Sequence, residues 1–199
     1  MEYLWEVFKE RQLNNVFIQT EETPNPNSLK FLPGQPVLAD GQGPVTFEKN
    51  SSIPSPLARQ LLAVEGVDSV FFGADFITIT KAQAFDWYVL KPLLLGTMMD
   101  HFVHEIPLFS EPKKASSEPN DDPIIRQICE LLDTRVRPAV AQDGGDIEFD
   151  RFEDGILYLN MRGACSGCPS STATLKSGIE NMLRFYVPEV LEVRQNTHD

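Results

Sequence analysis

The stretch from residue 156 to residue 185 carries three local signals in a row, which predict a strand, a tight loop and a helix. Residues 156–161 alternate between two faces and are rich in β-formers, which is typical of a buried strand. Gly163 ends that strand, and the sequence CSGC at residues 165–168 follows as a tight, exposed loop. Pro169 suits the first turn of a helix, and apolar residues then recur at helical spacing as far as Pro188. The sequence therefore places two cysteines between a strand end and a helix N-terminus.

The spacing of Cys165 and Cys168 allows both sulfurs to bind one metal centre, and Gly167 permits the tight turn between them. The free amides and the dipole of a helix N-terminus favour a thiolate or an anionic cofactor there. A zinc site normally takes four ligands, and the sequence offers no second CxxC or nearby histidine to complete one. Metal or cluster binding, a thiol–disulfide redox pair and inert thiols all remain open from the spacing.

The charge and hydropathy of the chain exclude several classes of partner. A net charge of −12 argues against nucleic acid and against anionic membrane surfaces. No apolar run approaches the ~20 residues of a membrane-spanning helix. The three cysteines, at positions 129, 165 and 168, suit a reducing compartment better than a disulfide framework. We expect a soluble acidic protein with no nucleic-acid or membrane partner.

Residues 16–108 are expected to form an α+β domain without a catalytic constellation. Strands are predicted at 16–20, 28–32, 67–72 and 76–80, helices from Ser55-Pro56 to Gly66 and from Lys91-Pro92 onward, and a loop at 39–52. His101 and His104 share the second helix, where their inner-face neighbours include Met98 and Met99. Without a carboxylate or thiol partner in view, these histidines are interpreted as packed or exposed rather than as metal ligands.

Two segments outside the domains differ in composition. Residues 109–121 combine Pro, Ser, Lys and acids, which is typical of a linker and sets the predicted boundary. Residues 1–15 are an N-terminal extension that is able to form a short amphipathic helix. The acids Glu2, Glu6 and Glu10 are unlike a transit peptide, which is rich in Arg and Ser and poor in acids.

Residues 122–199 are expected to form a second domain with the order α-β-β-α-β, two layers and helices on one face. Asp122-Pro123 starts its first helix, Pro138 kinks or restarts that helix, and Cys129 on it is interpreted as a buried core thiol. The sequence DGGD at 143–146 is interpreted as a helix stop rather than a carboxylate pair. Strands are predicted at 147–152 and 156–161 and a last short one at 190–193.

Several segments resemble a known family. The C-terminal domain of NifU-type proteins resembles RVRPAVAQDGGDIEF, GACSGCPSS and NMLRFYVPEV, and the Nfu N-terminal domain resembles VFIQTEETPNPNSLKFLPG and SPLARQLLAVEGVDSVFFGADFITIT. In this order, over residues 16–194, they resemble the mitochondrial Nfu family of iron–sulfur cluster scaffold proteins. The GxCxxCPSS motif together with the TPNPNSLKF loop is highly specific, whereas a CxxC alone is not.

The resemblance implies assembly and delivery of a [4Fe–4S] cluster, with [2Fe–2S] as the alternative, and with Cys165 and Cys168 as ligands. It implies upstream assembly factors, acceptor apoproteins such as lipoyl synthase-type enzymes, and residence in mitochondria, with a cytoplasmic form as the alternative. A cubane takes four thiolates and the motif supplies two per chain, so we expect a cluster-linked homodimer. We expect no enzymatic activity; the alternative is a thiol–disulfide oxidoreductase that uses the same cysteines.

Overall fold

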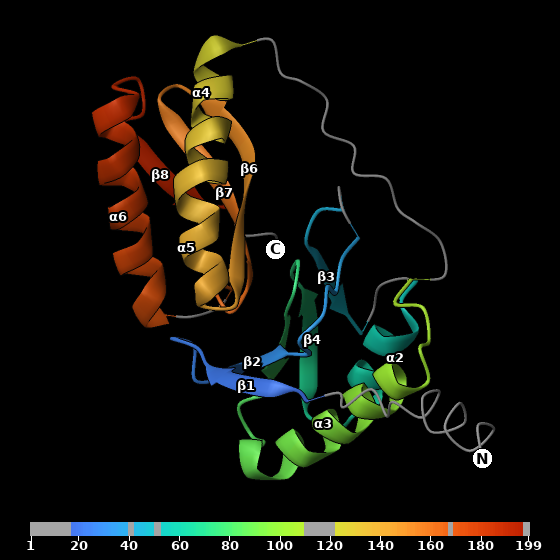
Figure 1. Ribbon diagram of the computed structural model, residues 1–199. Helices are drawn as coiled ribbons and strands as arrows, with labels where there is room; N and C mark the ends of the chain where they lie inside the picture. The colour runs from blue at the N-terminus through green and yellow to red at the C-terminus, as the bar shows by residue number, and fades with distance from the viewer. Residues whose placement is uncertain (1–16, 40–41, 50–52, 110–121, 167–168, 197–199) are drawn as a thin grey trace, which may run out of the picture.

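The protein is described by a computed structural model that covers residues 17–39, 42–49, 53–109, 122–166 and 169–196, without the side chains of 169–174. Figure 1 shows two α+β domains, each with its own sheet and helices, which confirms the predicted fold class. Each domain also has a separate hydrophobic core. Within the described residues, no helix is both long and apolar enough to cross a bilayer.

The first domain is an antiparallel sheet with two helices on one face. Its strands are, in spatial order, β1 (Gln19–Glu22), β2 (Ser28–Leu32), β5 (Ile77–Lys81), β4 (Val67–Phe72) and β3 (Val45–Glu48), and its helices are α2 (Pro56–Ala63) and α3 (Trp87–Val103). Helix α2 begins as predicted, because the Ser55 side chain accepts a hydrogen bond of 3.2 Å from the amide of Ala58. Its apolar residues pack against the inner face of the sheet.

Several boundaries in the first domain differ from the prediction; helix α2, for example, ends at Ala63 and not at Gly66. The segment expected to be a loop contains β3, which pairs with β4 at the edge of the sheet and buries Phe47. Helix α3 begins at Trp87 rather than at Lys91-Pro92, because Asp86 caps it by accepting a bond of 2.8 Å from Tyr88 N. Pro92 therefore lies inside the helix. The first strand is β1, shifted toward the C-terminus from the predicted 16–20.

The second domain follows the predicted order of elements. It contains α4 (Pro123–Leu131), a π-helical turn η1 (Leu132–Val136), α5 (Arg137–Gln142), β6 (Gly145–Glu153), β7 (Ile156–Gly163), α6 (Pro169–Tyr186) and β8 (Glu192–Gln195). Strands β6 and β7 form an antiparallel hairpin, and β8 lies parallel to β7, which requires the crossover helix α6 between them. The helices lie on one face of this sheet (Figure 1). The last strand starts two residues later than predicted.

The predicted restart at Pro138 is confirmed. A proline in a helix interior removes one amide donor, and here α5 begins at Arg137 directly after the π-helical turn. At its other end α5 stops at Gln142, and Gly144 takes a positive φ of 77° before β6 begins. The DGGD sequence thus ends a helix and starts a strand, as the sequence indicates.

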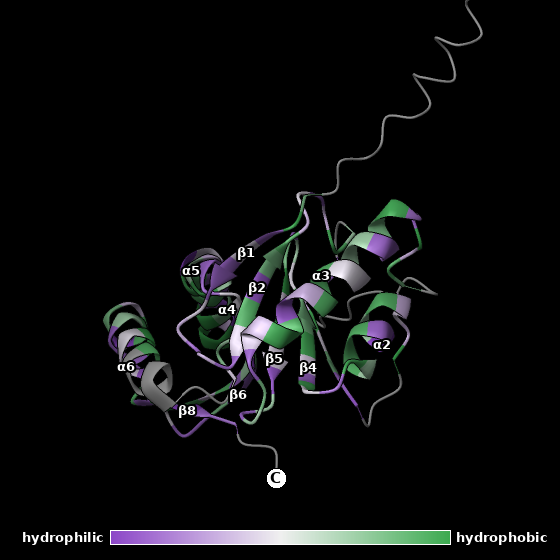
Figure 2. Cartoon of the chain, turned by 90° about the horizontal axis from the view of Figure 1, so that it is seen from below, coloured by the Kyte–Doolittle hydropathy of each residue, from purple (hydrophilic) through white to green (hydrophobic). Residues whose placement is uncertain are grey.

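The second face of the first sheet carries a row of buried residues that lies outside the first core. Lys30 on β2 is paired with Thr78 on β5, and Thr78 is paired with Phe71 on β4. All three are at most 7% exposed, although two of them are polar or charged. Figure 2 shows why: the sheet lies between α2 and α3 on one side and the second domain on the other. The two domains are therefore in contact through this face.

The predicted linker and extension fall mostly outside the described residues. Residues 1–15 are not described, and of residues 109–121 only Phe109 is. The Phe109 ring packs against Phe47 and Phe72 of the first core, with centroid distances of 6.3 and 6.1 Å. The boundaries at 108 and 122 stay a prediction.

The inner face of α3 carries a buried histidine. His101 is fully buried, whereas His104 is exposed and forms an ion pair of 3.3 Å with Asp100. Met99, expected on the inner face, is 44% exposed. Burial lowers the pKa of His101 from its usual value, against the opposing effect of the Asp100 charge.

We predict that His101 makes the protein less stable as the pH falls below about 6.5, the usual pKa of an unfolded histidine. The folded pKa is lowered, so the unfolded state binds the proton first, and stability is lost as the pH falls toward the folded pKa. His101→Leu should flatten the pH dependence of the free energy of unfolding, measured with denaturant between pH 7.5 and 5. Equal slopes for wild type and His101→Leu would contradict this explanation.

Candidate functional site

The loop that carries Cys165 rests on the ends of two strands. Gly163 ends β7 with a positive φ of 61°, and the chain turns back so that Ser166 N donates to Gly163 O at 3.1 Å. Cys165 N donates to Arg162 O at 3.3 Å. Ala164 N donates to Gly144 O at 3.1 Å, which ties the loop to the start of β6. Strand β7 ends at Gly163 and helix α6 begins at Pro169, so Cys165 lies between a strand end and a helix N-terminus, as predicted.

The structure describes only one of the two predicted ligands. Cys165 is described, whereas Gly167 and Cys168 lie outside the described residues. The sequence predicts an exposed loop, but Cys165 is only 6% exposed and packs with the second core. The expectation of exposure is therefore wrong for Cys165. The reason is tertiary, because the start of β6 lies directly against this residue.

Gly145 provides the space in which the thiol of Cys165 lies. A Cβ atom at Gly145 would overlap the Sγ of Cys165 and would lie 3.0 Å from its amide nitrogen and 3.1 Å from Arg162 O. The glycine pair of the DGGD sequence thus has two separate roles. Gly144 takes the positive φ that ends the helix, and Gly145 leaves room for the sulfur.

Charged side chains close to the loop are paired within the second domain. Arg137 binds Asp146 through two hydrogen bonds of 2.9 and 3.0 Å and binds Asp133 at 2.9 Å. The hydrogen bond to Asp146 raises the pKa of Arg137 above its usual value. Arg162 on β7 forms an ion pair with Glu148 on β6. Asp146 is thus committed to a structural ion pair, which agrees with the interpretation of DGGD as a helix stop.

Cys129 differs from Cys165 in place and in acidity. It lies on α4 and is partly buried, not fully buried as predicted; its neighbour Ile128 fills the core position. Burial, followed by the negative charge of Asp133, raises the pKa of the Cys129 thiol. A thiol with a raised pKa is a poor metal ligand and a poor nucleophile at neutral pH.

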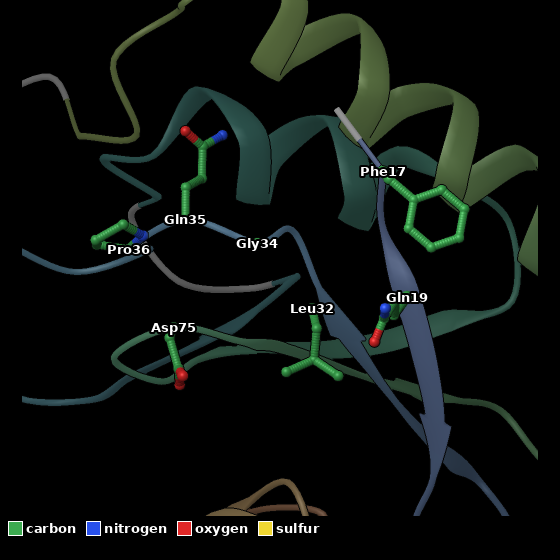
Figure 3. A pocket seen from close by; sticks show the side chains of 7 residues that line it. All are labelled: Phe17, Gln19, Leu32, Gly34, Gln35, Pro36 and Asp75. Carbon is green, nitrogen blue, oxygen red and sulfur yellow. The ribbon is translucent and has the colours of Figure 1, made fainter. Parts of the chain in front are cut away.

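Within its described residues, the first domain contributes no cluster of metal-ligating side chains. Among all described residues, no group of three or more His, Cys, Asp or Glu is placed to hold a metal ion. Figure 3 shows a shallow pocket beside β1, lined by Phe17, Gln19, Leu32, Gly34, Gln35, Pro36 and Asp75. Among the described residues that line it, Asp75 alone is ionisable, so these residues offer neither a metal site nor a nucleophile.

The first domain nevertheless reaches the cysteine loop, which the sequence did not predict. Asn25, in the loop between β1 and β2, donates from its side chain to Ala164 O at 3.3 Å and to Ser166 O at 3.2 Å. The repeated Pro-Asn pattern of this loop is typical of a rigid loop, but it does not indicate what the loop contacts. Arg162 also donates to Pro44 O at 3.3 Å. Residues on both sides of Cys165 are therefore bonded to the other domain.

Comparisons with known proteins agree with this two-domain arrangement. The family model "Scaffold protein Nfu/NifU N terminal" matches residues 18–105, and the model "NifU-like domain" matches residues 128–194. The human protein described as "NFU1 iron-sulfur cluster scaffold homolog, mitochondrial" is 51% identical over 191 residues, covering 92% of this chain and 73% of the human one. The relative from Drosophila ananassae with the same description is 50% identical over 184 residues, covering 91% of this chain and 64% of its own.

A solution NMR structure of a NifU-like protein from Saccharomyces cerevisiae is also similar, with 30% identity and a TM-score of 0.44; it covers 49% of this chain and 87% of that chain. The assignment itself comes from the sequences. Two family models match the two domains in order, and a relative is 51% identical over most of both chains. The chain therefore belongs to the Nfu family of iron–sulfur cluster scaffold proteins.

Proposed function

We propose that the chain is a non-enzymatic scaffold and carrier that binds a [4Fe–4S] cluster through Cys165 and Cys168 and delivers it to acceptor apoproteins. The observation that carries the proposal is the position of Cys165, at the end of β7 and ahead of the N-terminus of α6 in a NifU-like domain. The free amides and the positive dipole end of that helix favour a bound anion. Thiolate-ligated iron–sulfur clusters are anions of this kind.

The cysteine thiolates that the chain supplies suit a cluster that the protein carries and passes on. Thiolates are the usual ligands of iron–sulfur clusters, and a cubane takes four of them. The motif supplies two per chain, and Cys129 has a thiol whose pKa is raised, so it is a poor third ligand. Two chains that each contribute Cys165 and Cys168 complete the set. A cluster shared in this way leaves by exchange with the thiols of an acceptor.

The relatives guide the remaining assignments. The human and Drosophila proteins are described as mitochondrial scaffold homologues, and this similarity supports the proposal that the chain acts in mitochondria. Its partners would then be upstream assembly factors and iron–sulfur apoproteins, with lipoyl synthase-type enzymes as a representative class.

Anaerobic reconstitution with iron and sulfide tests the proposal. A chain that stays colourless and cycles between dithiol and disulfide would instead support the oxidoreductase alternative.

The first prediction of this proposal concerns the three cysteines. Cys165→Ser and Cys168→Ser should each abolish cluster binding, because each removes one thiolate per chain from the set. Cys129→Ser should keep the cluster, because this thiol lies on α4 and not on the loop. The measurement is iron and sulfide content with the visible absorption after reconstitution, and far-UV circular dichroism checks the fold. Loss of the cluster in Cys129→Ser with an unchanged fold would contradict the ligand assignment.

The second prediction concerns assembly. The loaded protein should be mainly dimeric and the apoprotein mainly monomeric, because the cluster supplies the link and two chains of charge −12 repel each other. Removal of iron with a chelator should return the dimer to monomer. Sedimentation velocity combined with iron counting measures both states. A loaded monomer with four irons and no added thiol would refute the bridging arrangement, whereas glutathione bound to a loaded monomer would show that an external thiol completes the set.

A further inference from the structure

The contact between the two domains is concentrated at the cysteine loop. Three side chains of the first domain, Asn25, Lys30 and Thr78, donate hydrogen bonds to the second domain. All their acceptors are backbone carbonyls in two short segments, residues 142–144 and 164–166. The second segment contains Cys165, and the two segments are bonded to each other. In Figure 1 the end of α5 and the β6–β7 strands lie toward the first sheet.

Asn25 makes the most direct of these contacts. Its side-chain NH₂ group donates to Ala164 O and Ser166 O, which are the carbonyls on either side of Cys165. The residue is only 3% exposed, so water does not replace these bonds easily. A buried amide that loses its acceptors keeps the full cost of desolvation. The loop therefore remains fixed to Asn25 as long as the domains are in contact.

The orientation of the Asn25 amide is set within its own loop. Its Oδ1 accepts from Asn27 N at 3.0 Å, which leaves the NH₂ group toward the carbonyls of the second domain. The backbone of Asn25 is held by Thr23, whose Oγ1 accepts from Asn25 N at 3.2 Å and donates to Asn25 O at 2.9 Å. The flipped amide would place an oxygen against two carbonyls. The NH₂ group of Asn25 is therefore oriented by contacts within the first domain alone.

Thr78 and Lys30 bind the segment 142–144, to which the cysteine loop is itself hydrogen-bonded. Thr78 Oγ1 donates to Gly144 O at 2.7 Å, and that carbonyl also accepts from Ala164 N. Lys30 Nζ donates to Gln142 O at 3.1 Å and forms an ion pair of 3.2 Å with Glu21. Because every acceptor is a backbone carbonyl, the bonds fix the path of the chain rather than any one side chain of the second domain.

We propose that Asn25 is a positioning residue of the cluster site, through which the first domain holds the Cys165 segment and slows release of the cluster. The proposal rests on the proposed function for its cluster. A ligand on a fixed backbone loses little freedom when it binds, so it holds the cluster more tightly than a ligand on a free loop would. The first domain thus supplies no ligand of its own but controls how long the cluster stays bound.

The test compares Asn25→Asp with Asn27→Asp in the full chain. The first variant replaces the NH₂ donor by an oxygen that faces two carbonyls. The second makes the same chemical change two residues away, where Asn27 Oδ1 accepts from Lys81 Nζ at 3.3 Å and a carboxylate is favourable. Two quantities are measured: the rate at which iodoacetamide alkylates Cys165 in the apoprotein, followed by mass spectrometry, and the rate at which an iron chelator removes the cluster from the loaded protein.

We expect Asn25→Asp to raise both rates by about tenfold and Asn27→Asp to leave both at the wild-type value. Wild-type rates in Asn25→Asp, or slower release of the cluster, would overturn the proposal. The alkylation rate needs no cluster, so it still decides the role of Asn25 if the wild type binds none. Failure of the wild type to bind a cluster would contradict the proposed function instead.

A second pair of variants covers the case in which Asn25→Asp does not fold, judged by circular dichroism. Thr78→Val removes the donor to Gly144 O and keeps the shape, while Thr78→Ser keeps the donor. We expect both rates to rise in Thr78→Val, by less than in Asn25→Asp, and to return to wild type in Thr78→Ser. If Thr78→Val and Thr78→Ser alter the unfolding free energy but neither rate, the contact is only structural and the proposal is wrong.

Discussion

The hydrogen bond from Ala164 N to Gly144 O joins the two backbone segments on which the candidate site depends. It closes the open end of the β6–β7 ladder, where Gly145 is paired with Gly163. The two glycines with positive φ, Gly144 and Gly163, allow the chain to turn on either side of this bond. Without the close approach that they permit, Cys165 would not lie against the start of β6.

The same pair of segments forms the meeting point of the domains. The Gly144 carbonyl accepts from Ala164 within its domain and from Thr78 across the interface, so one oxygen serves both purposes. The ring of Phe71 lies at Gly163, where a Cβ would approach it to 2.8 Å. The interface therefore combines directional bonds to the backbone with close apolar packing. The amide and hydroxyl donors of Asn25 and Thr78 carry no charge, so salt has little direct effect on their bonds, whereas Lys30 and Arg162 donate as charged groups.

A carrier must satisfy two opposing demands, because its cluster has to stay bound until an acceptor is present and then has to leave. The proposed ligands lie in the second domain, while the side chains that hold the loop come from the first. This separation allows ligand chemistry and loop mobility to be changed independently. It also gives the first domain, which lacks a metal-ligating cluster among its described residues, a physical reason to accompany the second.

Much of the local structure could be read from the sequence. Capping at Ser55 and Asp122, the restart at Pro138 and the alternation of β7 each depend on residues a few positions apart, and all were predicted correctly. The errors arose where tertiary contacts outweighed local signals. Strand β3 is short and polar on one side, so it exists only because β4 pairs with it. Pro92 looked like a helix start, but the cap at Asp86 begins the helix earlier and the proline is tolerated within it.

The sequence by itself determined the α+β class, the order of elements in the second domain and the chemical type of the candidate ligands, because these follow from side-chain identity and short-range periodicity. The tertiary structure decided that Cys165 is buried against Gly145 and that Asn25, 139 residues before Ala164, binds the carbonyls beside that cysteine. A backbone carbonyl is common to every residue and so leaves no pattern in the sequence when it becomes an acceptor. Only the folded chain shows which carbonyls a distant side chain reaches.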